Sequence, residues 1–296
     1  MVRYPSTSSP YLLLPYFLGL IVIVATTFVD RAYAGAWTAP KGAAYHKFAL
    51  NSFKSNKGFN TSGDLIAFTN DGITPISEFR DNNISYYGEF GLQDNFTVFV
   101  STAFKDLESD SPTGALTNSG IGDIDVGARY NLYNGPKGVF STQGLIKIPE
   151  AYDEKDTVPL GNGQYDFELR MLYGNSSLYP LYYGVELGYR WRAKAPSDEW
   201  KYLLEAGYTL NPKYYVRAKL DGTYSARNGA NLLDVSGNPT LSNEYDLGKA
   251  EFTFGYVIRK ELMLEGTWTP TPYGKNTAYG DTFQIAIIYA PQPKSK

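Results

Sequence analysis

Cysteine is absent from this 296-residue chain, and histidine occurs once, at His46. Without cysteine there are no disulfides and no thiolate metal sites, and a single histidine leaves almost no imidazole chemistry. The formal net charge is only -3, and no long basic or acidic run occurs, so a nucleic-acid partner is not expected. What the chain has in quantity is aromatic residues, which make up 16% of it.

Long apolar runs are also lacking, with one exception near the amino terminus. Tyr11 to Val29 are almost all apolar, an arginine precedes them, and Ala32-Tyr33-Ala34 supplies a small-x-small site before Gly35. This pattern predicts a cleaved signal peptide over residues 1–34 and a single mature domain over residues 35–296. The alternative is an uncleaved helical anchor, because the run approaches the length that spans a bilayer. No second run follows, so any further membrane contact has to be made by strands.

Alternation of apolar and polar residues is the main pattern of the mature chain. From Tyr183 to Arg192, large apolar residues alternate with glycine, glutamate and arginine. Successive side chains of a strand point to opposite faces, so this stretch has one apolar face and one charged face. About twelve such stretches follow one another between Ala43 and Tyr289, most of them near the length that a tilted strand needs to cross a membrane.

The connections between these stretches alternate in length. Short, turn-rich links at 93–95, 134–137, 211–213 and 259–261 take turns with mostly longer ones at 107–119, 150–163, 228–243 and 271–280. Short turns on one side and long loops on the other are typical of outer-membrane barrels, and this alternation requires an even number of strands. Residues 55–77 are rich in glycine, asparagine and threonine, and they predict a loop with room for a short hairpin.

Tyrosine and tryptophan occur near both ends of several apolar faces. Examples are Tyr165 and Tyr173, Tyr183 and Trp191, Trp200 and Tyr208, and Tyr214 and Tyr224. Girdles at two membrane interfaces need this placement, whereas the core of the rival fold, a large soluble β-sandwich, gives no reason for it. We therefore predict an all-β fold: one antiparallel transmembrane β-barrel of about twelve strands in an outer membrane, with short periplasmic turns and long extracellular loops.

Two stretches resemble a known family. Residues 120–130 (GIGDIDVGARY) are similar to the strand opening, and residues 160–167 (LGNGQYDF) to the L-G-x-G segment that follows it, of the outer-membrane barrels named for the meta-pathway of phenol degradation. A proline-ended strand at 147–149 lies between them in both. The resemblance spans residues 78–289. It implies an outer-membrane channel in a Gram-negative-type envelope that transports aromatic or other apolar compounds.

The polar faces of the strands supply the candidate lumen-lining residues. They are Asp123, Asp125, Arg129, Asp166, Glu168, Arg170, Glu186, Arg190, Arg192, Lys201, Glu205, Arg217, Lys219, Asp221, Glu251 and Glu265. Both signs are mixed along neighbouring strands, which leaves two interpretations open. The side chains form either an interior salt-bridge network that stiffens the wall or charge rings that select solutes. A barrel of twelve strands lies between small barrels filled by side chains and large barrels with an aqueous pore, so the strand count does not decide between these two interpretations.

Catalytic residues, metal ligands and cofactors are not predicted. His46 is the only histidine, and no GxSxG elbow occurs, so the residues of a serine-type enzyme are missing. Asp123 and Asp125 lie two apart on one face and could bind calcium, but no further acid follows at the spacing of a calcium loop. A strand entry with two lumen-facing acids is the better interpretation.

The function expected from the sequence is an outer-membrane channel or porin-like transporter for small solutes, with apolar or aromatic compounds as candidates. The alternative is a structural or interaction barrel whose lumen is plugged by a salt-bridge network and whose extracellular loops carry the function. The expected partners are membrane lipid, a small-molecule solute and, during biogenesis, the barrel-assembly machinery. The final strand, Phe283 to Tyr289, resembles the terminal signal that this machinery reads, although residues 290–296 follow it.

Overall fold

The structure is a computed structural model that describes residues 35–68, 76–112, 114–194, 197–229, 237–241 and 244–293. The predicted signal peptide lies outside the described residues. Within the described ranges the regular elements are all β-strands. None of the described residues belongs to a helix long and apolar enough to cross a membrane.

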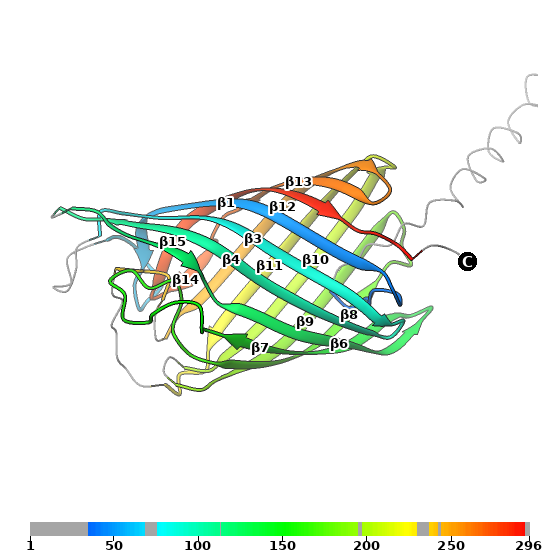
Figure 1. The fold of residues 1–296 in the computed structure, drawn as a ribbon, viewed down its shortest axis with the longest axis horizontal. Coiled ribbons are helices and arrows are strands. Elements are labelled where there is room, and N and C mark those ends of the chain that lie inside the picture. The colour runs from blue at the N-terminus through cyan, green and yellow to red at the C-terminus, as the bar shows by residue number, and fades with distance from the viewer. Residues whose placement is uncertain are drawn as a thin grey trace, which may run out of the picture. The chain divides into compact units, whose positions relative to one another are not determined.

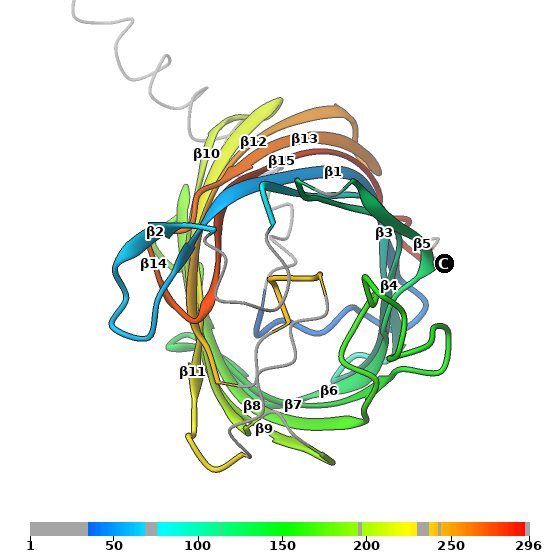
Figure 2. The ribbon, with the colours of Figure 1, turned by 90° about the vertical axis from the view of Figure 1, so that its left-hand side faces the viewer.

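A closed antiparallel barrel is formed by twelve strands. They are β1 (Ala44–Phe59), β3 (Glu78–Gln93), β4 (Phe96–Asp110), β6 (Ile124–Gly135), β7 (Gly138–Ile148), β8 (Asp166–Asn175), β9 (Leu181–Arg192), β10 (Glu199–Asn211), β11 (Tyr214–Ser225), β12 (Asp246–Arg259), β13 (Leu262–Thr269) and β15 (Thr277–Tyr289). Each pairs with the next, and β1 pairs with β15, so the ring closes (Figures 1 and 2). Closure leaves no wall strand with an unpaired edge, as lipid requires.

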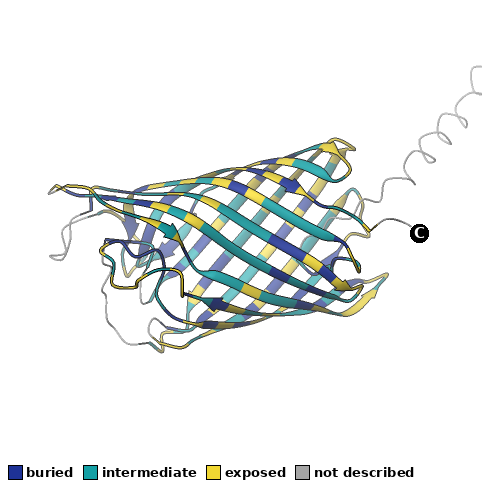
Figure 3. Cartoon of the chain, viewed as in Figure 1, coloured by how far each residue is buried: buried dark blue, intermediate teal, exposed yellow. Residues whose placement is uncertain are grey.

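Large apolar side chains cover the outer face of the wall. At the seam, Leu50 of β1 pairs with Ile285 of β15, and on the other side of β1 it pairs with Ile84 of β3. All three are more than half exposed, and exposed positions alternate with buried ones along the strands (Figure 3). Soluble monomers rarely expose so large a continuous apolar surface, whereas a transmembrane barrel needs it to meet lipid. The predicted transmembrane β-barrel is confirmed.

The two ends of the barrel differ in their connections. Short turns at 94–95, 136–137, 176–180, 212–213 and 260–261 lie at the end where β1 begins and β15 finishes. Most connections at the other end are longer. The predicted asymmetry and the even strand count are therefore confirmed, and the turn end corresponds to the periplasmic side.

Strand pairing extends past the predicted strand ends on the loop side. β1 continues to Phe59 and pairs with β2 (Leu65–Ala67), so residues 55–77 begin with a hairpin; β5 (Leu116–Ile121) pairs with β4, and β14 (Tyr273–Lys275) pairs with β12. Predicted loops 107–119 and 271–280 are therefore partly strand, and loop 228–243 lies partly outside the described residues. Beyond the lipid band a strand does not need alternating apolar and polar residues, because its backbone hydrogen bonds are enough to continue the sheet.

Lysine in place of Ile285 tests the assignment of the two faces. Ile285 is 69% exposed on the outer face, so a cation there should lower the unfolding free energy by about 2 kcal/mol or more. The neighbouring Gln284 points inward, where it donates a hydrogen bond to Asn51, and Gln284→Lys should cost clearly less. Urea unfolding in phospholipid vesicles, followed by tryptophan fluorescence, measures both; equal losses would contradict the assignment.

Candidate functional site

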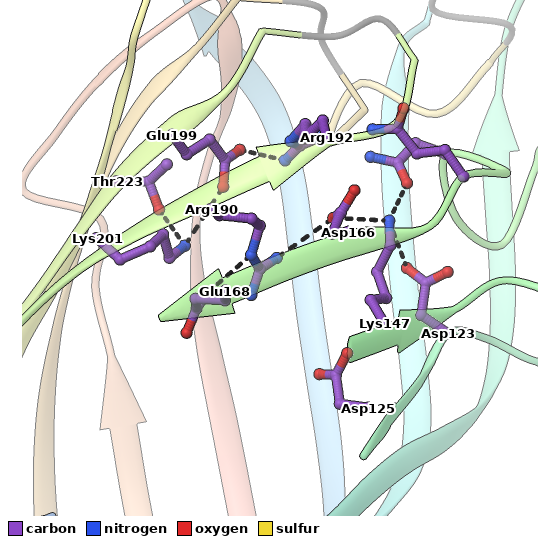
Figure 4. A network of polar contacts seen from close by, with 12 residues as sticks. Asp123, Asp125, Lys147, Asp166, Glu168, Arg190, Arg192, Glu199, Lys201 and Thr223 are labelled. Atoms are coloured by element: carbon purple, nitrogen blue, oxygen red, sulfur yellow. Dashed lines mark hydrogen bonds and ion pairs between the residues drawn. The ribbon is translucent and has the colours of Figure 1, made fainter. Parts of the chain in front are cut away.

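A series of ion pairs crosses the inner face of β6 to β9 and begins near the loop end (Figure 4). Lys147 Nζ lies 3.6 Å from Asp123 Oδ2 and 3.0 Å from Asp166 Oδ2, and Arg190 Nη1 lies 3.7 Å from the same Asp166 oxygen. Strand register causes these contacts, because Lys147 on β7 stands directly opposite Asp166 on β8. Opposite charges facing each other across strands stabilise the sheet.

The same series continues toward the turn end. Glu168 pairs with both Arg190, at 2.7 Å from Nη2, and Arg170, whose Nη1 then lies 3.0 Å from Glu186 Oε2. The Glu168 side chain is 1% exposed. We call the set Asp123, Lys147, Asp166, Arg190, Glu168, Arg170 and Glu186 the polar ladder. It links the loop end of the lumen to the turn end through one unbroken line of contacts.

Further ion pairs surround the polar ladder on the inner face. Glu265 is shared by Lys47 at 2.8 Å and Arg217 at 3.1 Å, and it also accepts a hydrogen bond of 2.8 Å from the Tyr215 hydroxyl. The remaining pairs are Arg129 with Glu89, Arg192 and Lys201 with Glu199, and Lys219 with Glu205. Most lumen charges are thus neutralised locally, as buried charges generally have to be.

The structure joins nearly all the predicted lumen residues into these clusters. The exceptions are Asp125, Asp221 and Glu251, for which no ion pair forms among the described residues. Asp125 faces Ser101 at 3.5 Å, and Asp221 and Glu251 stand opposite Lys249 and Lys219 on neighbouring strands without contact within ion-pair distance. The role of the sixteen residues in guiding a solute stays a prediction.

Small neutral side chains line the opposite wall of the lumen, on β1, β3, β4 and β15. Asn51 donates hydrogen bonds to Asn83 and Ser85 at 2.8 and 2.9 Å, and it accepts one from Gln284 at 2.7 Å. A cavity of about 360 Å³ lies along this wall, lined by Ser85 and Ser101 and also by the charged side chains of Lys47, Lys105 and Asp123. This side of the lumen therefore combines a patch of hydrogen-bonded neutral side chains with Lys47 and Glu89, whose charges are paired with Glu265 and Arg129.

Aromatic rings also point into the lumen, which the sequence analysis missed. Tyr87 hydrogen-bonds Glu89, Tyr215 hydrogen-bonds Glu265, and the Tyr182 ring lies flat over Gly207, where a Cβ would collide with it. The signal is present in the sequence as the doublets Tyr86-Tyr87, Tyr182-Tyr183 and Tyr214-Tyr215. Because strand side chains alternate, each doublet places one ring in lipid and one in the lumen.

Residues 35–43, which we call the lumen segment, enter the turn end of the barrel and cross its interior (Figure 2). Arg129 donates a 2.9 Å hydrogen bond to the Trp37 carbonyl, Ser141 donates one to the Ala36 carbonyl, and the Ala39 amide donates one of 2.7 Å to Thr97. The alanines of the segment are buried. The lumen is thus narrowed at the turn end by a segment without strand periodicity, which sequence patterns could not reveal.

The loop of residues 149–165, the cap loop, folds over the other end. Val158 and Leu160 pack with Phe79 and Leu107 in a small apolar core. The Tyr152 hydroxyl donates a 2.6 Å hydrogen bond to Asp123, the first member of the polar ladder. Burial and the negative charge of Asp123 raise the pKa of Tyr152 well above its usual value, so the phenol stays protonated and keeps donating. The cap loop is therefore tied to the lumen charges.

Metal binding finds no support among the residues that the structure describes. They contain no group of three or more histidine, cysteine, aspartate or glutamate side chains arranged to hold an ion. Asp123 contacts Tyr152 and Lys147, and Asp125 turns to Ser101. His46 lies on the outer face, where its ring stacks on Tyr86.

Comparison with known proteins identifies the family. The family model described as "Putative MetA-pathway of phenol degradation" matches residues 50–287, most of the described chain. The chain belongs to this family. The resemblance noted in residues 120–130 and 160–167 is thereby confirmed. A search of curated proteins finds no sequence that matches the chain.

Solved structures show the same fold. An outer membrane channel from Pseudomonas putida F1 is 14% identical, covers 89% of this chain and 100% of its own, and has a TM-score of 0.68. The NanC porin is 8% identical, with 81% and 98% covered and a TM-score of 0.52. At these identities the likeness establishes the fold, which is that of outer-membrane barrels, as predicted.

Removing Glu168 tests the polar ladder. Glu168→Gln leaves Arg170 and Arg190 without their shared carboxylate, and breaking a buried ion pair of this kind should lower the unfolding free energy by about 3 kcal/mol. Glu251→Gln is the matched control, because no ion pair of Glu251 is lost, and it should change stability little. Urea unfolding midpoints of the refolded barrels compare the two; identical midpoints would show that the ladder does not hold the wall.

Proposed function

We propose that the chain is an outer-membrane channel that passes small solutes, and that apolar or aromatic compounds are the class it favours. The observation that carries this proposal is the pairing of most lumen charges in ion pairs, beside a patch of neutral side chains around Asn51. A pore that selects ions needs unpaired charge of one sign at its constriction. Here Asp166, Glu168 and Glu265 each face cations, so a neutral solute meets little net field.

The inward aromatic rings support the same class of solute. Tyr87 and Tyr182 offer flat apolar faces within an otherwise polar lumen, and such faces bind planar rings by offset or edge-on stacking. The family description concerns phenol degradation, and the similar structure from Pseudomonas putida F1 is that of an outer membrane channel. Both agree with the proposal. A non-enzymatic role also agrees with His46 lying on the outer face.

Export and assembly are part of the proposal. Cleavage after Ala34 would free the lumen segment, and the final strand β15 would engage the barrel-assembly machinery. The chain continues past Tyr289, where the Pro291 carbonyl accepts a 3.1 Å hydrogen bond from the Ala44 amide. The tail thus prolongs the pairing of β15 with β1, so the assembly signal need not stand at the last residue.

A tryptophan at Ser101 tests the passage of solutes through the cavity beside β3 and β4. Ser101 lines the cavity there, so Ser101→Trp should fill it and lower single-channel conductance and solute flux several-fold. Val100→Trp, one residue away on the lipid face, should leave both unchanged. Planar-bilayer recordings of residues 35–296 give the conductance, and entry of radiolabelled toluene into vesicles with a lipopolysaccharide outer leaflet gives the flux. A folded wild-type barrel that neither conducts nor speeds toluene entry would refute the channel.

The second candidate is a plugged barrel whose loops carry the function. It is favoured by the lumen segment at the turn end and the cap loop at the other, since both reduce the bore. Deletion of residues 36–42 separates the two functions. If the wild-type barrel is silent and the deletion variant conducts, the barrel is plugged; if both conduct and the deletion only raises the current, the native lumen is open.

A further inference from the structure

The first residue of the lumen segment lies against the last member of the polar ladder. A Cβ added to Gly35 would stand 3.1 Å from Glu186 Oε1, so the Cα of Gly35 lies next to that carboxylate. The other oxygen, Oε2, is bound by Arg170 at 3.0 Å. Gly35 also has a φ of 59°, a conformation that glycine adopts without strain. The next residue, Ala36, is only 1% exposed, so this part of the lumen segment is packed within the barrel.

The polar ladder contains one more carboxylate than cations. Asp123, Asp166, Glu168 and Glu186 are balanced only by Lys147, Arg170 and Arg190. Glu168 is bound by two arginines, whereas Glu186 is bound by one that it shares with Glu168. A second arginine, Arg129 on β6, also attracts Glu186, and it pairs with Glu89 and donates to the Trp37 carbonyl beside Gly35. A partly buried carboxylate in this position favours a neighbouring cation.

We propose that Glu186 binds the α-ammonium group that signal cleavage creates at Gly35, and that this ion pair holds the lumen segment in the barrel. The amine would be a further cation on Glu186, facing Oε1, while Arg170 binds Oε2 and Arg129 lies nearby. A free α-amine has an ordinary pKa of about 7.7–8.0 and is mostly charged at neutral pH. Inside the lumen such a charge requires an opposite partner. The proposal rests on the predicted cleavage after Ala34 and not on the transport of any solute.

The pair has a defined pH dependence. A carboxylate partner stabilises the ammonium form, so the amine pKa in the folded barrel is raised above its unfolded value. The contribution of the pair to stability is then fully present below about pH 7.7–8.0 and is lost as pH rises through the raised pKa. Cleavage thus has a second role, because it makes the charge that seats the segment.

Titration of the amine tests the proposal directly. The mature barrel is isolated after export, its mass is checked for a start at Gly35, and its amines are ¹³C-methylated and followed by NMR against pH. The pKa of the α-amine should be about one unit higher in the wild type than in Glu186→Gln. The wild-type amine then keeps its proton at a roughly tenfold lower proton concentration. Glu251→Gln, which alters a lumen carboxylate on β12, should titrate as the wild type does.

A second variant covers the case in which Glu186→Gln does not fold. Two glutamines inserted between Ala34 and Gly35 keep Ala32-Tyr33-Ala34 as the small-x-small site, so cleavage leaves the new amine two residues away from Gly35 and Glu186 while every barrel residue is kept. The pKa of this amine should return to the ordinary range. A mature chain that starts elsewhere, or a wild-type amine that titrates like the extended one, overturns the proposal. A planar-bilayer recording without current would count against the proposed channel only, because the titration of the amine does not depend on transport.

Discussion

Backbone hydrogen bonding around a closed ring is the constraint on which the rest of this structure depends. In hydrocarbon every backbone amide and carbonyl needs a partner within the protein, and a sheet meets that need only when its first strand reaches its last. Here β1 pairs with β15 from His46 opposite Tyr289 to Phe59 opposite Thr277. Closure then fixes the register of every other pair, and with it which side chains meet inside.

The interior electrostatics follow from that register. Lys147 and Asp166, or Glu168 and Arg190, are partners because the strands place them opposite one another on the inner face. The charged side chains inside a barrel of twelve strands cannot all reach bulk water, so carboxylates and cations have to pair with one another. The result is a wall stiffened by ion pairs on β6 to β9, and a patch of small hydrogen-bonded side chains on β1, β3 and β15 that lies beside further ion pairs of Lys47 and Glu89. Of the two interpretations open at the outset, the interior salt-bridge network describes the geometry of the lumen charges.

Sequence patterns predicted the wall well and the contents of the lumen poorly, for physical reasons. Strand number, faces and girdles follow from local rules: alternation for Tyr183 to Trp191, short turns such as 212–213, aromatics at strand ends. The neighbours of Glu186 cannot be derived from such local rules, because they depend on which distant segment of the chain enters the barrel. The alanine-rich lumen segment has no period, and its hydrogen bonds to Arg129 and Ser141 join residues about a hundred positions apart. The inward orientation of Tyr182 and Tyr215 was missed because aromatic residues were assigned to the lipid face. A glycine on the next strand leaves room for each of these rings inside the lumen.

The seam between β1 and β15 joins the two ends of the sequence, which sets the order in which the barrel can form. All other wall contacts join strands that are neighbours, or nearly so, along the chain. The seam therefore closes last, after the final strand has left the ribosome and crossed the inner membrane. Until then two long edges with unpaired backbone groups are exposed, and such edges pair readily with other chains. The order of closure therefore makes the unclosed sheet, and not the finished barrel, the form most prone to aggregation.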